Sequence, residues 1–142
     1  MSEAGSPDEV EWDRHFEAFP LHRFLGLRLE EARPGFARIS MKTGPNTLGG
    51  VAGSVHGGIL AALVDIAMLR AQFSLFQRDE QPAGTADLNI TYLRPALGER
   101  IYAEAAVLKK GRSLIVTEVS ILDEKGVLCA KGRTIYAVRQ KG

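Results

Sequence analysis

The stretch GSVHGGILAALVDIAMLRAQ, residues 53–72, decides how this chain is built. A histidine and two glycines precede an apolar run, which predicts an α-helix beginning near His56 and ending near Gln77. At about 1.5 Å per residue, such a helix would span roughly 33 Å. Its apolar residues lie nearly all round the helix, which is typical of a helix inside a domain rather than at its surface.

The segments on both sides of this helix indicate β-structure. Before it, LRLEEARPGFARISMK alternates around Pro34 and Gly35, which predicts a hairpin. After it, the breaks RPALGE, KKGRS and DEKG have the composition of turns. They separate four predicted strands, at about residues 84–94, 99–110, 113–123 and 127–138. One buried helix with this many strands favours an α+β domain, in which an antiparallel sheet of about five or six strands wraps around the helix.

The rest of the chain is assigned more coarsely. Residues 1–9 are polar and contain Gly, Ser and Pro, which predicts a mobile tail before a single domain at 10–142. The segment EWDRHFEAFPLHRFLG predicts one or two short helices, stopped by Pro20 and Gly26. The segment TGPNTLGGVAGSV, residues 43–55, predicts a loop in which glycines permit tight backbone geometry.

The composition excludes several classes of protein. Among 142 residues, 18 Lys and Arg balance 17 Asp and Glu, so the net charge of +1 gives no general attraction to nucleic acid or to an anionic membrane. A single cysteine excludes an intrachain disulfide and fits a reducing compartment. The N-terminus has no apolar signal segment, and charges interrupt the apolar run of residues 59–76. We therefore expect a cytoplasmic domain with no nucleic-acid or membrane partner.

Asp65 is the unexpected residue of the helix. Its neighbours three and four positions away are Ala61, Ala62, Met68 and Leu69. None is a cation, so none can pair with the carboxylate on its own helix. Burying an isolated carboxylate is costly unless it is hydrogen-bonded or its pKa rises. Asp65 is therefore either a group that caps a loop or meets a distant arginine, or a general base or nucleophile in a dry site.

His56, Gly57 and Gly58 stand at the start of the predicted helix. The first N–H groups of a helix have no partner within it, and the helix dipole is positive at this end. Such a place suits an anion or a carbonyl oxygen that gains negative charge, and the glycines let a substrate approach the backbone. The alternative is a glycine-rich turn in which His56 is an ordinary helix cap.

The spacing of the two groups predicts an oligomer. His56 and Asp65 are nine positions apart, which on a helix is about 13.5 Å of rise and about 900° of rotation, so they lie on opposite faces. They cannot act on one carbonyl within a single copy. If both are catalytic, Asp65 must meet His56 and Gly57 of a second subunit across a two-fold axis, which gives a dimer with two composite sites.

Other constellations are weaker. Ser54, His56 and Asp65 do not form a triad because Asp65 lies out of reach of His56, and no G-x-S-x-G motif is present. Cys129 lies in the middle of a predicted strand and reads as a core residue. The three histidines lack the spacing of metal ligands, so no metal site is expected.

Three segments together resemble a known family: GSVHGGILAALVDIAM, GTADLNITYLRPA and LKKGRSLIVTEVSILDEKGVLCAKGRTIY. They resemble the hotdog-fold acyl-CoA thioesterases of the phenylacetate-degradation (PaaI-like) type, over roughly residues 20–138. The resemblance implies a long helix wrapped by the sheet, a homodimer joined edge to edge, and often a homotetramer made of two dimers. It implies no cofactor beyond the coenzyme A that forms part of the substrate.

The resemblance also implies residue roles. The Gly57 N–H, helped by His56, would polarise the thioester carbonyl, and Asp65 of the partner subunit would attack it or activate the water that does. Thr85 matches a small hydroxyl residue that helps place that water. Many relatives carry Asn or Gln six residues before the histidine, contacting substrate or water. This chain has Gly50 there, and Asn46 lies four residues further back.

A thioester needs little more than this set, because its thiol leaves with a pKa of about 8.5 and so with little acid assistance. For the phosphates of coenzyme A, the candidates are Arg94, Lys109, Lys110, Gly111, Arg112 and Ser113. The alternative for this cluster is a solvated turn. Ile59, Leu63 and Met68 are candidates for the acyl pocket or, alternatively, for core packing.

Two other functions stay open. One is a hotdog hydratase or dehydratase acting on acyl thioesters, although the His-Phe-Pro-Gly and hydratase motifs of those enzymes are absent. The other is a non-catalytic acyl-CoA-binding protein; such regulators carry a DNA-binding domain, and the roughly twenty residues before the predicted fold are too few for one.

Overall fold

The structure is a computed structural model that describes residues 7–141. In chain order its elements are α1 (Pro7–Arg14), η1 (Phe16–Ala18), α2 (Pro20–Leu25), β1 (Leu27–Arg33), β2 (Phe36–Lys42), η2 (Val51–Gly53), α3 (Gly57–Phe73), β3 (Glu80–Tyr92), β4 (Arg100–Lys110), β5 (Leu114–Leu122) and β6 (Leu128–Gln140).

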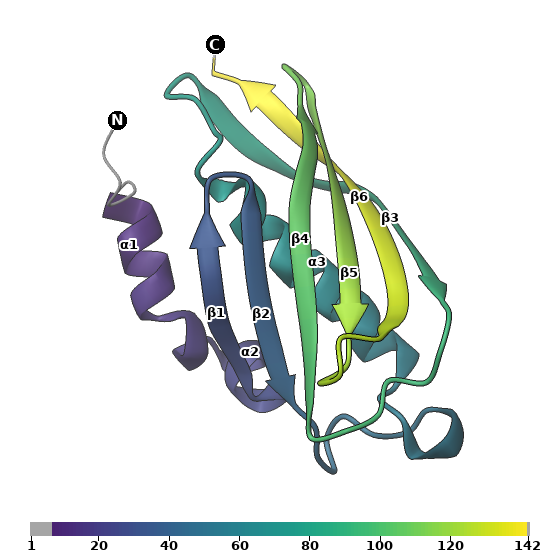
Figure 1. Ribbon diagram of the computed structural model, residues 1–142. Coiled ribbons are helices and arrows are strands. Elements are labelled where there is room, and N and C mark those ends of the chain that lie inside the picture. Colours follow the sequence, from purple (N-terminus) through teal and green to yellow (C-terminus); the bar gives the residue numbers. More distant parts are fainter. Residues whose placement is uncertain (1–6, 142) are drawn as a thin grey trace.

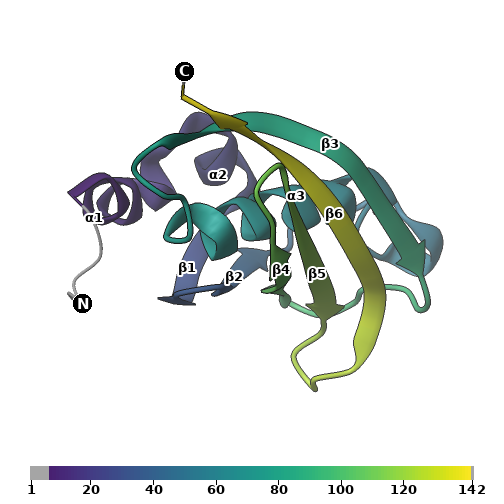
Figure 2. The same ribbon diagram turned by 90° about the horizontal axis from the view of Figure 1, so that it is seen from above.

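Six strands form one sheet in the order β1-β2-β4-β5-β6-β3, and every neighbouring pair is antiparallel. The sheet curls around α3, as Figures 1 and 2 show from two directions. The predicted α+β class with a sheet wrapped around a long helix is confirmed. Within the described chain β1 and β3 are the two edge strands, so each has a row of backbone groups that pairs with no other strand.

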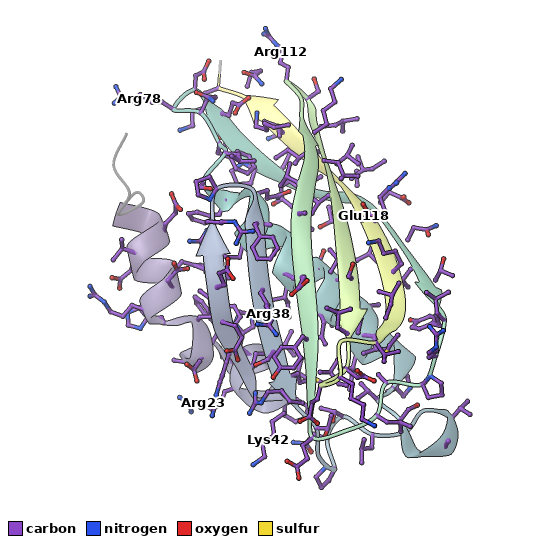
Figure 3. All side chains as sticks on the ribbon, viewed as in Figure 1. Arg23, Arg38, Lys42, Arg78, Arg112 and Glu118 are labelled. Atoms are coloured by element: carbon purple, nitrogen blue, oxygen red, sulfur yellow. The ribbon has the colours of Figure 1, made fainter. Side chains whose placement is uncertain are left out.

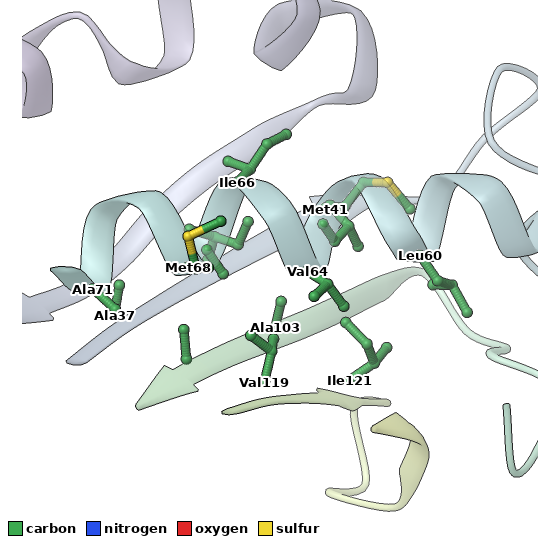
Figure 4. Packing of buried hydrophobic residues seen from close by; sticks show 14 of the residues in the cluster. Ala37, Met41, Leu60, Val64, Ile66, Met68, Ala71, Ala103, Val119 and Ile121 are labelled. Carbon is green, nitrogen blue, oxygen red and sulfur yellow. The ribbon is translucent and has the colours of Figure 1, made fainter. Parts of the chain in front are cut away.

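The core lies between α3 and the concave face of the sheet. Figure 4 shows Val64 and Met68 of α3 above Ala103, Val119 and Ile121 of the central strands, all fully buried. Burying an aliphatic side chain of this size contributes about 1.5–3 kcal/mol, so this face of α3 holds the helix on the sheet. The helix also comes very close to β6, where a Cβ on Gly132 would lie 2.9 Å from the methyl groups of Val64.

The helix boundaries differ from the predicted ones at two places. α3 ends at Phe73, not near Gln77, because the last turn tightens and the Leu75 N–H bonds to the Gln72 carbonyl three residues back. Pro20 does not stop a helix but begins α2, where its fixed φ and missing N–H suit the first helical position. Gly26, with φ +65°, does end α2 as expected.

The N-terminal boundary also shifts. Residues 1–6 of the predicted tail lie outside the described residues, whereas residues 7–9 belong to α1. α1 lies beside the C-terminal part of α3, at the end of the molecule where β3 begins (Figure 2). Arg70 of α3 holds it there, since its guanidinium donates to both carboxylate oxygens of Asp13 at 2.6 and 2.9 Å. No helix among residues 7–141 combines the length and the apolar character needed to cross a membrane.

Candidate active site

Asp65 lies half-buried on the side of α3 that faces the edge strand β3. It has a partner that its own helix could not supply, because the Thr85 hydroxyl on β3 donates to its Oδ1 at 2.9 Å. Thr85 pairs in the sheet with Tyr136 of β6. The Asp65 charge reaches this tyrosine: burial, and then the nearby carboxylate, raise the pKa of the Tyr136 hydroxyl. The expected dry site is thus only half enclosed within one chain.

The N-terminus of α3, at His56, Gly57 and Gly58, forms the helix mouth, and one of its N–H groups has no partner among the described residues. His56 caps α3, and its Nδ1 accepts from the Gly58 N–H at 3.0 Å. An acceptor nitrogen carries no proton, so the neutral ring has its hydrogen on Nε2, which can donate outward. The Gly57 N–H is bonded to nothing among the described residues and stands at the positive end of the helix dipole. The chain therefore offers two donors on adjacent residues at the N-terminus of α3, the Gly57 N–H and the Nε2–H of the exposed His56.

Tyr92, at the end of β3, fixes this mouth and was missed by the sequence analysis. Its hydroxyl donates to the Gly57 carbonyl at 2.7 Å. Its ring also covers Gly57, since a Cβ there would lie 3.2–3.3 Å from three tyrosine atoms. The available signal was the alternation of Leu88, Ile90 and Tyr92, which puts this tyrosine on one face of the strand with two half-buried residues.

The two halves of the candidate site remain apart in a single chain. Along α3, Asp65 and Gly57 are separated by a rise of about 12 Å. Each half is tied to a different point of β3, Asp65 through Thr85 and Gly57 through Tyr92. One protomer therefore supplies both kinds of group but does not bring them together.

The loop before α3 is tightly packed at Gly50, which leaves no room for a side chain at this position. A Cβ on Gly50 would lie 2.5 Å from the Ser54 hydroxyl and 2.7 Å from the Val55 carbonyl oxygen, so a larger residue there requires the backbone to move. The Gly50 N–H donates instead to the Ser54 carbonyl at 2.9 Å. Asn46 is exposed earlier in the same loop. The close neighbours of Gly50 are thus Ser54 and Val55, and the hydrogen bond to Asp65 comes from Thr85 instead of this loop.

The predicted phosphate-binding residues fall into two groups at opposite ends of the sheet. Lys109, Arg112 and Ser113 are exposed at the β4–β5 turn, where Figure 3 labels Arg112. Gly111 lies in the same turn and donates its N–H to the Leu114 carbonyl. Arg94 follows the far end of β3 and donates to the Leu128 carbonyl at 3.2 Å.

The positive charge of Lys110 is already paired with a neighbouring carboxylate. Its ammonium contacts the Glu80 carboxylate at 2.9 Å and the Gly111 carbonyl at 3.1 Å. The hydrogen bond from Lys110 is the main cause that holds the pKa of Glu80 below its usual value. Among the described residues, Lys109 and Arg112 have no ion-pair partner, so they are the cations of this turn that remain available.

Three residues considered in the sequence lie in the core. Cys129 is buried, as predicted, and burial raises the pKa of its thiol, which makes it a poor nucleophile. Leu63 and Met68, candidates for the acyl pocket, are fully buried against the sheet and line none of the three main cavities among the described residues. They take the alternative role of core packing.

The comparisons with known proteins agree with this architecture. The Thioesterase superfamily model matches residues 52–130. The medium/long-chain acyl-CoA thioesterase YigI of Escherichia coli (strain K12) is 33% identical over 132 residues, covering 84% of this chain and 85% of YigI. Acyl-coenzyme A thioesterase 13 of Homo sapiens is 38% identical over 123 residues, covering 84% of this chain and 82% of that protein.

Among solved structures, a variant of the phenylacetic acid degradation protein PaaI from Thermus thermophilus superposes with a TM-score of 0.73 at 28% identity. The superposition covers 84% of this chain and 98% of that one. Together with the sheet wrapped around α3, these matches show that the chain belongs to the thioesterase superfamily, as a thioester hydrolase of the PaaI-like type with the hotdog fold.

Proposed function

We propose that this protein hydrolyses acyl-CoA thioesters to the free acid and coenzyme A, at composite sites built by two protomers. The carrying observation is that the chain presents two half-sites, Asp65 bonded to Thr85 and the free Gly57 N–H, both anchored on the same edge strand. The names of YigI and acyl-coenzyme A thioesterase 13 support the substrate class. The name of YigI also favours acyl chains of medium or greater length.

The chemistry follows from the groups present. The Gly57 N–H and the His56 Nε2–H would bind the carbonyl oxygen and stabilise the negative charge that it gains. Asp65 would deprotonate the attacking water and later return that proton to solvent, or it would attack the carbonyl carbon itself, forming an acyl–Asp65 anhydride that a second water hydrolyses to the free acid. In either route Thr85, whose proton goes to Asp65, can accept a hydrogen bond from the water. The C–S bond then breaks, and the sulfur leaves as a thiolate that takes its proton from solvent. No metal or separate cofactor enters these steps.

The edge strand suggests how two copies meet. β3 pairs only with β6 in the described chain, which leaves a long edge open to another strand. If two β3 strands pair antiparallel about a two-fold axis near Leu88 and Asn89, Thr85 comes opposite Tyr92 of the partner subunit. Asp65 then approaches Gly57 of the partner subunit, because each is tied to one of these two residues. A further pairing of dimers into a tetramer belongs to the same proposal.

This dimer also suggests a place for the nucleotide of coenzyme A. Antiparallel pairing brings the β4–β5 turn of one protomer to the same end as Arg94 of the partner subunit. Lys109, Arg112 and the partner's Arg94 would then share the phosphates, which favour cations and turn N–H groups. A cytoplasmic location completes the proposal, supported by the single, free and buried Cys129.

The test is release of free thiol from a panel of acyl-CoAs, measured with a thiol reagent on the wild type and on Asp65→Ala. We expect hydrolysis by the wild type and a loss of about 10²–10⁴-fold or more in kcat for the variant, with an unchanged fold by circular dichroism. Equal rates for the two proteins would remove Asp65 from the mechanism. Hydration of an enoyl-CoA without thiol release would indicate a hydratase, and saturable binding without turnover would indicate an acyl-CoA-binding protein.

A further inference from the structure

A large cavity opens at the C-terminal end of α3 and is unexplained by the groups discussed so far. Its volume is about 820 Å³. It is lined by the last turns of α3, the turn that follows them, the first residues of β3, the helix α1 and the last part of β6. Apolar side chains form much of its wall, namely Trp12, Leu69, Phe73, Phe76, Pro82 and Tyr136. The charged residues Glu9, Arg78, Glu80 and Lys141 also line it, so the cavity suits a ligand with a long apolar part that lies along the apolar wall.

The near end of the cavity lies next to Asp65. Leu69, which lines it, stands one helical turn beyond Asp65 on the same face of α3. Tyr136, which also lines it, is the sheet partner of Thr85 and feels the Asp65 charge. Pro82, three residues before Thr85, continues the wall along β3. Asp65 itself does not line the cavity, but a chain attached to a carbonyl at Asp65 and directed along Leu69, Tyr136 and Pro82 would run toward it.

The far end is closed by α1. The Trp12 indole stacks on Phe73 with the ring centres 6.2 Å apart, and both rings line the cavity. α1 is held firmly, because the guanidinium of Arg70, only 5% exposed, grips both oxygens of Asp13 and lies 3.6 Å from Glu9. A buried arginine with two acidic neighbours fixes the position of the helix that carries Trp12. This wall is therefore tied to α3 through Arg70.

We propose that this cavity holds the acyl chain of the substrate and that Trp12 of α1 is the residue that limits its length. The inference rests on the proposed function and names the substrate class more closely. From Asp65 to Phe73 the helix rises about 12 Å. An extended chain advances about 1.3 Å per carbon, given C–C bonds of about 1.5 Å. An unbranched acyl group of about eight to ten carbons is therefore about as long as the helix rise from Asp65 to Phe73, and the cavity fits a chain of this length.

The experiment measures kcat and KM for saturated acyl-CoAs from four to sixteen carbons, using about two-carbon steps, on the wild type, Trp12→Ala and Trp12→Phe. We expect the wild-type kcat/KM to be highest near eight to ten carbons and to fall beyond, in line with the helix rise of roughly 12 Å from Asp65 to Phe73. Trp12→Ala should move the maximum about two to four carbons longer, because the lost indole is several ångströms long. Trp12→Phe keeps the stack on Phe73 and should shift the maximum less.

Control variants and substrates test whether Trp12 limits the length of the acyl chain or only supports the fold. Val10→Ala changes an exposed residue of the same helix that does not line the cavity, and it should leave the length profile unchanged. The four-carbon substrate, too short to reach Trp12, should keep its kcat within about twofold in both Trp12 variants, which shows that the fold and the reacting groups are intact. Asp13→Asn loosens α1 and should broaden the length profile.

Two results would overturn the proposal differently. If Trp12→Ala and Trp12→Phe hydrolyse every chain length with the wild-type profile while Asp65→Ala loses activity on all of them, the thioesterase stands and this cavity is not the acyl site. If the wild type releases thiol from no acyl-CoA of the panel, the proposed function fails together with this inference.

Discussion

Gly57 is the first residue of α3 and contacts Tyr92 at the end of the edge strand β3. A proline at this position would remove its N–H while keeping the path of the backbone. His56 has φ −57° and ψ 133°, the conformation that a residue before proline prefers, and proline is well tolerated at the first position of a helix. Gly57→Pro should therefore lower kcat by about 10²–10³-fold, the usual effect of removing an oxyanion donor.

Gly57→Ala is the matched control. It adds the same Cβ against Tyr92 but keeps the N–H group, so its kcat should fall much less. Both variants are compared at saturating acyl-CoA, with thermal unfolding as a check on the fold. Equal losses in the two variants would mean that contact with the Tyr92 ring, rather than the donor, accounts for the effect.

At the scale of residues, the sequence predicted features within a single helix, whereas it did not predict contacts between residues that are far apart in the chain. Asp65 could be singled out because its helical neighbours are all uncharged, and the match of Thr85 to it came from the family resemblance. The hydrogen bond from Tyr92 to Gly57 joins residues thirty-five positions apart, and no local pattern predicts it. The closure of the loop at Gly50 depends on the paths of Ser54 and Val55, which composition alone does not fix.

At the scale of elements, the turn between α3 and β3 is held by Glu80. Its carboxylate accepts from the Gln77 N–H at 2.8 Å and from the ammonium of Lys110 on β4. Because these bonds lower the pKa of Glu80 in the folded protein, their contribution is complete above its ordinary pKa of 4.5 and is lost as the pH falls through the lower folded value.

Glu80→Gln should accordingly reduce the free energy of unfolding at pH 7 by about 1.5–3 kcal/mol, the range for a hydrogen bond to a charged group. Urea denaturation of both proteins at neutral pH and near pH 3 measures this difference, which should shrink on acidification. A difference that is the same at both pH values would show that the charge of Glu80 contributes nothing. Lys109→Gln, an exposed change on the same sheet, is the control.

The strands were predictable because their turns carry glycine, proline and charged residues, whereas element ends were not. The predicted strand at 84–94 is β3, which begins at Glu80, and the predicted helix end near Gln77 moved to Phe73. Each change has its own tight turn: the helix ends where the Leu75 N–H bonds to the Gln72 carbonyl, and the strand begins where Glu80 accepts from the Gln77 N–H. α1 was read as part tail and part helix because its packing depends on Arg70, far away in sequence.

For the whole molecule, the deciding question is whether a complete site needs two chains. The fold follows from one apolar helix and the strands around it, and in the described chain it leaves β3 as an open edge strand. The two half-sites on that edge make the dimer testable by mixing two inactive variants. Asp65→Asn lacks the carboxylate and keeps the helix mouth, whereas Gly57→Pro lacks the donor and keeps the carboxylate.

A heterodimer of these two variants would contain one site with both defects and one site with neither. If subunits assort at random after refolding or co-expression, half of the dimers are mixed, and about a quarter of the wild-type sites return. Mixed dimers isolated through two different affinity tags should show about half of the wild-type kcat per dimer. A mixture of Asp65→Asn with Asp65→Ala, in which no site is complete, should stay inactive. Failure of the first mixture to recover activity, with mixed dimers present, would place Asp65 and Gly57 in separate roles and end the composite-site mechanism.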